Sequence, residues 1–238
     1  MRFFKSFFAV AIIAAGSVNA APVTFPAADG VTVHADYQGQ GNQPLVVLFH
    51  QAGSNLHEYD PIVPRLHDLG FDTLAVSQRS GGARFGGDNE TALGVSGDPD
   101  YLAAYPDMVA ALAFARGKSG QVVVWGSSYS SALVFKLASE HPQGVVGLLS
   151  FSPGEYFGSA FSVKMAAAKV AAPVFVTSAS DAGEIAAAKE IVAAVPGQAT
   201  QFVPKRGVHG SSTLRDDQNP KGAAENWAAV DAFLVPLR

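Results

Sequence analysis

Residues 122–130 are Val122-Val123-Val124-Trp125-Gly126-Ser127-Ser128-Tyr129-Ser130. The first four form a continuous apolar run, which is typical of a parallel strand buried on both faces. Residues 128–140 follow with helical spacing. Between strand and helix, residues 126–130 resemble the motif G-x-S-x-G, a tight turn that exposes the hydroxyl of its central serine. The sequence therefore predicts a strand–turn–helix unit with a nucleophilic serine in the turn.

The spacing of this motif selects Ser128 as the nucleophile rather than Ser127 or Ser130. Small residues two positions before and after it let the strand and the helix pass closely, and free N–H groups at the helix start favour developing negative charge. Ser130 stands where the motif has a glycine, which weakens the match. An ordinary serine-capped helix is the alternative interpretation, because serine is a favoured N-cap residue.

Strands and helices alternate along the rest of the chain. Apolar runs predict six strands, at residues 45–49, 72–76, 122–125, 145–151, 173–177 and 201–203. Helical spacing predicts helices at residues 56–69, 101–116, 128–140, 160–169, 184–194 and 223–234. This order is typical of an α/β fold with a parallel sheet covered by helices on both faces. Because ligands of such sheets bind beyond the carboxyl ends of the strands, the residues that follow each strand form the candidate site.

Two further candidates for catalysis follow the last two predicted strands. His209 follows the last one, where a neutral imidazole can accept the serine proton and return it to a leaving group. Asp181 follows the strand before it and is predicted to orient the imidazole, with Glu184 as the second choice of acid. A surface histidine and an aspartate at a helix start are the alternatives. The chain order Ser128, Asp181, His209 favours the catalytic interpretation.

Together with His50-Gln51-Ala52-Gly53 after the first predicted strand, these residues resemble the α/β-hydrolase superfamily, nearest to its small dienelactone-hydrolase-like and simple esterase branches. The resemblance covers nearly all of the chain beyond residue 20. It implies one domain with a mostly parallel sheet of about eight strands, and hydrolysis through an acyl-enzyme. Dienelactone hydrolases use a cysteine nucleophile, and this sequence has no cysteine, so their particular reaction is not carried over.

The resemblance also implies an oxyanion hole made of backbone N–H groups. In the family, one donor comes from the turn after the first central strand and the other from the residue after the nucleophile. By position, these donors are Ala52 and Tyr129. Gln51 stands where the family usually has a glycine, so Gln51 is an alternative first donor. His50 is also open to interpretation as a metal ligand or a structural residue, but no second ligand at suitable spacing supports a metal.

Composition and charge limit the classes of function. Apolar residues make up 48% of the 238-residue chain and charged residues 15%, which is enough to build one large core. The formal net charge is −4 and no run of Lys or Arg occurs, which argues against a nucleic-acid partner. The absence of cysteine excludes disulfides and thiolate metal sites. No phosphate-binding or calcium-loop motif is present, and we predict neither a cofactor nor a metal.

Residues 1–20 have the pattern of an export signal. A basic start and an apolar run lead to Val18-Asn19-Ala20, which places small residues where a signal peptidase cleaves. Cleavage after Ala20 would leave a hydrolase domain at residues 21–238, with no further membrane span, in the periplasm or the medium. An uncleaved anchor is the alternative, but the apolar run is shorter than the ~20 residues of a membrane span.

We therefore expect an exported serine hydrolase that cleaves carboxylic esters of small or medium-sized molecules. Residues 152–172, between two predicted strands, are too few for the large lid domain often inserted there, so the site is predicted to be open or partly covered by residues 154–169. An exported peptidase or amidase on the same fold is one alternative. A non-catalytic binding protein on a hydrolase scaffold is the other, since a fold alone does not define a function.

Overall fold

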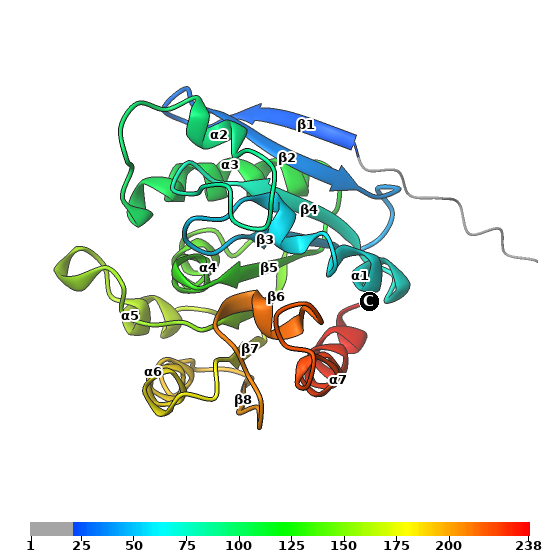
Figure 1. Ribbon diagram of the computed structural model, residues 1–238, viewed down its shortest axis with the longest axis vertical. Coiled ribbons are helices and arrows are strands. Elements are labelled where there is room, and N and C mark those ends of the chain that lie inside the picture. Colours follow the sequence, from blue (N-terminus) through cyan, green and yellow to red (C-terminus); the bar gives the residue numbers. More distant parts are fainter. Residues whose placement is uncertain (1–20) are drawn as a thin grey trace, which may run out of the picture.

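The computed structural model describes residues 21–238, which form one eight-stranded sheet flanked by helices (Figure 1). The strands are β1 (Ala21–Pro26), β2 (Thr32–Gln38), β3 (Leu45–Phe49), β4 (Asp72–Ser77), β5 (Val122–Ser127), β6 (Val145–Phe151), β7 (Val174–Thr177) and β8 (Ala199–Phe202). They lie in the order β1-β2-β4-β3-β5-β6-β7-β8. β2 is antiparallel to both of its neighbours, and β3 to β8 pair in parallel. The predicted α/β class with a mostly parallel, eight-stranded sheet is confirmed.

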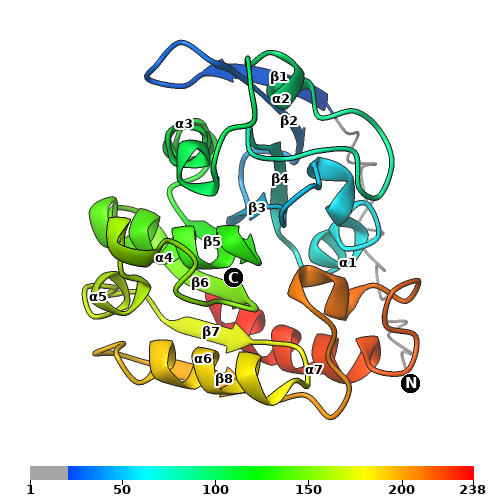
Figure 2. The same ribbon diagram turned by 60° about the vertical axis from the view of Figure 1, so that its left-hand side comes forward.

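The six strands predicted from apolar runs are β3 to β8, with ends shifted by at most two residues. β1 and β2 form an antiparallel hairpin that the alternation of strands and helices did not predict. Figure 2 shows this hairpin at one end of the sheet and β8 at the other. The predicted export signal, residues 1–20, lies outside the described residues.

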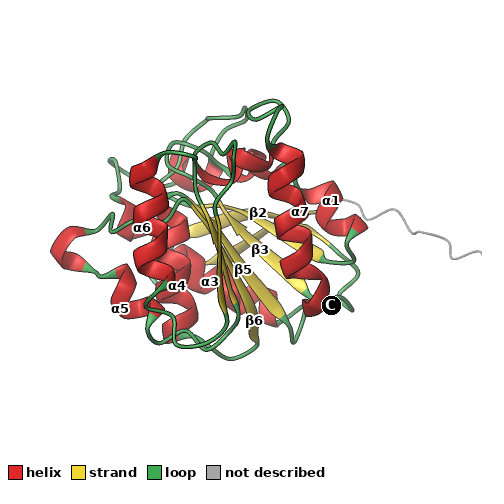
Figure 3. Ribbon diagram, turned by 90° about the horizontal axis from the view of Figure 1, so that it is seen from below, coloured by secondary structure: helices red, strands yellow, loops and turns green. Residues whose placement is uncertain are grey.

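Helices cover both faces of the sheet (Figure 3). One face packs against α3 (Tyr105–Arg116), α4 (Tyr129–Glu140), α5 (Val163–Ala167) and α6 (Ala182–Val192). The other face packs against α1 (Val63–Asp68) and α7 (Ala223–Leu234). The short helix α2 (Glu90–Leu93) lies in the Gly-rich segment after β4. The 3₁₀ helices are η1 (Leu56–Tyr59), η2 (Tyr101–Ala104), η3 (Gly158–Ala160), η4 (Gly210–Leu214) and η5 (Val235–Leu237).

Residues 56–69, predicted as one helix, form η1 and α1 with a break at residues 60–62. Proline explains the break, because it lacks an N–H and its ring clashes with the preceding helical turn. Pro61 falls in the break, and Pro64 lies in the first turn of α1, where a proline is tolerated. The segment predicted as one helix at residues 101–116 likewise begins as η2 before α3.

Burial of the central strands on both faces explains their unbroken apolar runs. In β3, Leu45, Val47 and Phe49 belong to the core beneath α3 and α4, whereas Val46 and Leu48 belong to the core beneath α1 and α7. The parallel strands end at one edge of the sheet, where the polar candidates follow. In the part of the chain that the structure describes, no helix is long and apolar enough to cross a membrane.

Candidate active site

Ser128 lies between β5 and α4 with backbone angles φ 58° and ψ −122°. A non-glycine residue rarely adopts a positive φ, because its Cβ then crowds the backbone. The turn therefore holds Ser128 in a strained conformation, as the motif requires. Gly126 permits this turn, since a Cβ at that position would lie 2.3 Å from the carbonyl oxygen of Ser130.

Ser130, which stands where the motif has a glycine, has hydrogen-bond partners of its own. Its hydroxyl lies 2.6 Å from the carbonyl oxygen of His50 and 3.1 Å from Oε1 of Gln78. The residue is fully buried. These contacts connect the first turn of α4 to the segments that follow β3 and β4. Serine at this position therefore adds contacts to the turn instead of disrupting it.

His209 contacts both Ser128 and an acidic residue through its two ring nitrogens. Nε2 lies 2.7 Å from Oγ of Ser128, and Nδ1 lies 2.7 Å from Oε1 of Glu184. His209 immediately precedes η4, and Glu184 lies in the first turn of α6. With its proton on Nδ1, the imidazole donates to Glu184 and leaves Nε2 free to accept the serine proton. The structure thus brings together three side chains that follow β5, β7 and β8 along the chain.

The prediction that Asp181 contacts His209 is wrong, and the second choice, Glu184, occupies that place. Asp181 is the N-cap of α6, and its Oδ1 accepts from the N–H groups of Gly183 at 2.9 Å and Glu184 at 3.2 Å. The first N–H groups of a helix have no partner within the helix, so an aspartate before it is drawn to them. Asp181 is exposed to solvent, and its hydrogen bonds serve the helix rather than the histidine.

Glu184 is held in its ionised form by the groups around it. Burial alone would raise its pKa, but hydrogen bonds from His209, Ser152 and the Ala179 N–H outweigh burial and lower the pKa from 4.5 to about 2. The Ala179 N–H lies 2.9 Å from Oε2, the oxygen that does not contact the histidine. An ionised carboxylate on Nδ1 stabilises a positive charge on the imidazole.

The two predicted oxyanion donors have N–H groups without an acceptor among the described residues. They are Ala52, in the turn after β3, and Tyr129, the first residue of α4. The alternative donor, Gln51, is engaged, because its N–H donates to Oε2 of Glu58 at 2.8 Å. The geometry thus favours Ala52 over Gln51.

His50 has a structural role beside the site, because both of its ring nitrogens contact backbone groups. It is fully buried, its Nδ1 lies 2.8 Å from the carbonyl oxygen of Gln51, and its Nε2 accepts from the N–H of Gln78 at 2.9 Å. Burial lowers its pKa to about 4, so the ring is neutral with its proton on Nδ1. Both ring nitrogens are occupied, which leaves neither for a metal. Within residues 21–238, no group of three or more His, Cys, Asp or Glu side chains is placed to hold a metal ion.

The candidate site is open to solvent on the histidine side. The side chain of His209 is 42% exposed, whereas Ser128 is 8% exposed. Tyr156 comes from the segment after β6, and its hydroxyl donates to the carbonyl oxygen of Ser152 at 2.6 Å. The same hydroxyl is a neighbour of the Ser128 side chain. Phe157 in the same segment packs against the core. Sequence analysis placed this segment beside the site but did not single out Tyr156 as a neighbour of the nucleophile.

A family model described as alpha/beta hydrolase fold matches residues 44–220, well over half of the chain. The chain belongs to the alpha/beta hydrolase fold family. The family resemblance stated from the sequence motifs is therefore confirmed. No curated protein sequence matches this hydrolase with significance.

Solved structures similar to this hydrolase include an esterase and a dienelactone hydrolase. The Pyrococcus furiosus esterase Pf2001 superposes with a TM-score of 0.70 at 17% identity, covering 91% of this chain and 92% of that one. Est1E from Butyrivibrio proteoclasticus, solved with ferulic acid bound, has a TM-score of 0.70 at 14% identity, covering 88% and 96%. Dienelactone hydrolase from Anabaena variabilis has a TM-score of 0.69 at 16% identity, covering 91% and 97%. At these identities the likeness shows the shared fold.

Proposed function

We propose that this hydrolase is an exported serine esterase in which Ser128, His209 and Glu184 form the catalytic triad. The observation that supports the proposal most strongly is the pair of 2.7 Å contacts that join the three side chains through the two ring nitrogens of His209. Groups at these distances supply a nucleophile, a general base and an acid that fixes the tautomer of the base. They lie beyond the carboxyl ends of the strands, where ligands of open α/β sheets bind.

In the first half-reaction, Oγ of Ser128 attacks the ester carbonyl carbon while Nε2 of His209 takes the hydroxyl proton. The N–H groups of Ala52 and Tyr129 donate to the oxyanion that forms. When the carbonyl re-forms, the bond to the alkoxy oxygen breaks and His209 passes the proton to the departing alcohol. Glu184 stabilises the imidazolium during this step. The acyl group remains on Ser128.

In the second half-reaction, water takes the place of the alcohol. His209 accepts a proton from the water molecule as the water oxygen attacks the acyl carbon. The same oxyanion donors stabilise the second tetrahedral intermediate. As the acyl–oxygen bond breaks, His209 returns the proton to Oγ of Ser128. Each cycle consumes one ester and one water molecule and releases an alcohol and a carboxylic acid.

Esters of small or medium-sized molecules fit this site best. The histidine is exposed, and the short segment between β6 and β7 leaves the site without a large lid domain. Solved structures with the same fold include a protein described as an esterase and Est1E with ferulic acid bound, which supports the choice of an ester substrate. We propose that Tyr156 and the neighbouring segment line the acyl side of the site.

Hydrolysis of a panel of p-nitrophenyl esters of increasing acyl length, set against the matching p-nitroanilides, tests this proposal. We expect turnover of the esters, with the anilides at least about 100-fold slower. His209→Ala is expected to lose most of the turnover. Ser119→Ala, in the loop before β5, is the control and is expected to keep it. Faster anilide turnover would favour a peptidase or amidase, and turnover unchanged in His209→Ala would favour a non-catalytic binding protein.

We also propose export, with cleavage after Ala20, on the pattern of residues 1–20. Expression of the full chain followed by N-terminal sequencing of the protein recovered from the periplasm and the medium tests this. We expect mature protein that begins at Ala21. Full-length protein confined to the cytoplasm would contradict export, and full-length protein in the membrane fraction would favour an uncleaved anchor.

A further inference from the structure

Glu58 is a fully buried carboxylate that the proposed reaction does not use. It lies in η1, directly after the turn that contains the first oxyanion donor. Its Oε2 accepts from the N–H of Gln51 at 2.8 Å, and its Oε1 accepts from Nε2 of Gln51 at 3.2 Å and from the hydroxyl of Ser127 at 2.6 Å. One buried side chain therefore contacts both the residue before Ala52 and the residue before Ser128.

The same hydrogen-bond network reaches the segment that follows His209. Oγ of Ser127 accepts from the N–H of Ser211 at 2.8 Å, and Nε2 of Gln51 also donates to Oγ of Ser212 at 3.1 Å. Ser211 and Ser212 are both buried in η4, and Oγ of Ser211 accepts from the indole N–H of Trp125 at 2.9 Å. Glu58 thus connects three chain segments, and each segment supplies one part of the proposed catalytic site.

The donors around Glu58 require both of its oxygens to act as acceptors. Among the described residues, the Ser127 hydroxyl has no acceptor other than Glu58, so its proton is directed there. The backbone N–H and the side-chain amide of Gln51 are donors as well. A protonated carboxyl would place its own hydrogen against one of these donors, whereas an ionised carboxylate accepts from all of them.

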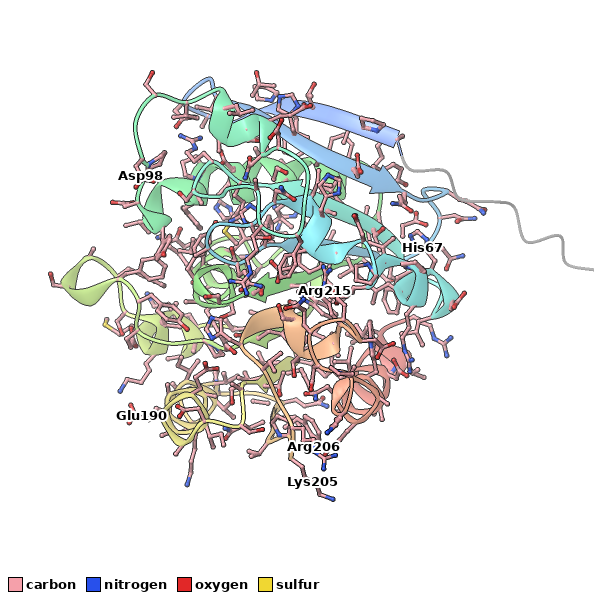
Figure 4. The ribbon with its side chains drawn as sticks, viewed as in Figure 1. His67, Asp98, Glu190, Lys205, Arg206 and Arg215 are labelled. Atoms are coloured by element: carbon pink, nitrogen blue, oxygen red, sulfur yellow. The ribbon has the colours of Figure 1, made fainter. Side chains whose placement is uncertain are left out.

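Arg215 is a cationic neighbour of Glu58. Burial raises the pKa of Glu58 above its ordinary value, and the hydrogen bonds from Ser127 and Gln51 and the charge of Arg215 offset only part of this rise. Nη1 of Arg215 donates to the carbonyl oxygen of Glu58 at 2.7 Å, and Figure 4 shows Arg215 between η1 and the η4 segment. The guanidinium thus joins the same two segments, while its Nε and Nη2 pair with Asp217.

We propose that Glu58 is a positioning residue of the active site. Its ionised carboxylate holds the turn of Ala52 and the loop of His209 in register with Ser128. The inference rests on the proposed function and adds to it a residue outside the triad and the oxyanion hole. Displacement of a catalytic group by ~1 Å can lower a rate about 100-fold, so a buried side chain that fixes three segments at once has a large effect on turnover.

Glu58→Gln, measured in the full mature chain, tests the inference. The amide keeps the size of the side chain but presents an NH₂ group where the carboxylate accepts every one of its hydrogen bonds. We expect kcat to fall about 10- to 100-fold with KM changed by less than about 3-fold, because the affected groups act on the transition state. Asp107→Asn is the matched control: it also neutralises a fully buried carboxylate, one that pairs with Arg79, and its kcat is expected to stay within about 3-fold.

A fall in kcat shared equally by both variants, or a Glu58→Gln enzyme with the wild-type kcat, would overturn the inference. A Glu58→Gln protein that fails to fold leaves Ser127→Ala as the second variant. It removes only the hydroxyl between Glu58 and Ser211 and is expected to lower kcat about 3- to 10-fold at unchanged KM. Wild-type kcat in Ser127→Ala would then count against the inference.

Amide hydrogen exchange gives a readout that does not depend on activity. We expect the N–H groups of Gln51 and Ser211 to exchange at least about 10-fold faster in Glu58→Gln than in Asp107→Asn, because only the first substitution disturbs their network. Unchanged exchange at both amides would overturn the inference. A wild-type protein without esterase turnover but with this exchange pattern would instead contradict the proposed function and leave the network intact.

Discussion

The carboxyl ends of β5 and β7 each place a residue of the candidate site, but they do so differently. At β5, Ser128 follows the last strand residue directly and precedes α4. At β7, residues 178–181 separate the strand from α6, and the acid that contacts His209 lies inside the helix. The sequence pattern located the residue at β5, whereas at β7 it selected a neighbour of the residue that makes the contact.

The difference comes from competition for the acid nearest the strand. At β5 the turn is short and strained, and its positive φ falls on Ser128. At β7 the start of α6 needs a cap, and Asp181 provides it with two hydrogen bonds. Glu184, three residues later, is then the acid that remains for the histidine. The first acid after β7 therefore caps the helix, and the next acid along the chain contacts the histidine.

The largest expected effect separates the two acids of this segment. We expect Glu184→Gln to lower kcat about 10²- to 10⁴-fold, because the amide no longer fixes the tautomer of His209 or stabilises its charge. Asp181→Asn is the matched control, and its kcat is expected to stay within about 3-fold, since asparagine caps a helix as well as aspartate. Steady-state kinetics of ester hydrolysis measure both. The reverse order of the two effects would restore Asp181 as the catalytic acid.

The second effect concerns the turn at β5. Gly126→Ala is expected to lower the free energy of unfolding by about 3 kcal/mol or more, because the added methyl would overlap the backbone of Ser130. Gly120→Ala is the control, since a Cβ there meets no atom within 4 Å, and its effect should be below about 0.5 kcal/mol. Urea denaturation measures both. Equal stabilities would show that the turn tolerates a side chain at residue 126.

A smaller effect is expected at the cap of α6. Asp181→Ala should lower the free energy of unfolding by about 1 kcal/mol, because two N–H groups at the helix start lose their acceptor. Asp181→Asn should retain nearly all of this stability. Thermal unfolding followed by circular dichroism compares the variants. An alanine variant as stable as the wild type would contradict the capping role.

A further effect is a pH dependence of stability that arises from Glu184. Its pKa is about 2 in the folded protein against an ordinary value of 4.5, so the folded state favours the ionised form. The resulting stabilisation is complete above about pH 4.5 and is lost as the pH falls toward 2. Urea midpoints between about pH 5 and pH 3 should therefore fall more steeply for the wild type than for Glu184→Gln. Parallel pH profiles would show that Glu184 has no depressed pKa.

The central fold was predictable because most of the parallel strands are apolar runs followed by a helix. β1 and β2 were missed because they lie outside this alternation, and their outward residues are polar or partly exposed. The places of Ser128 and His209 followed from the strand ends. The spacing Asp181-x-x-Glu184 is that of a capping box, and this signal could have assigned the aspartate to the helix start.

Glu58 had no signal in the sequence. It falls in a stretch with helical spacing, where a single glutamate is ordinarily solvated. Its partners Ser127 and Arg215 lie 69 and 157 residues away along the chain, so only the packed structure brings them together. The role of Ser130 was equally hidden in the sequence, because its hydroxyl stabilises the turn through the carbonyl oxygen of His50, which is 80 residues away along the chain.

Covalent labelling with a fluorophosphonate tests the central claim most directly, because the probe phosphonylates an activated serine and releases fluoride. Intact-mass measurement followed by peptide mapping locates the adduct. The account predicts one adduct per folded wild-type chain, on Ser128, and none on Ser128→Ala. Absence of labelling on the folded wild type, or an adduct that persists in Ser128→Ala, would contradict it.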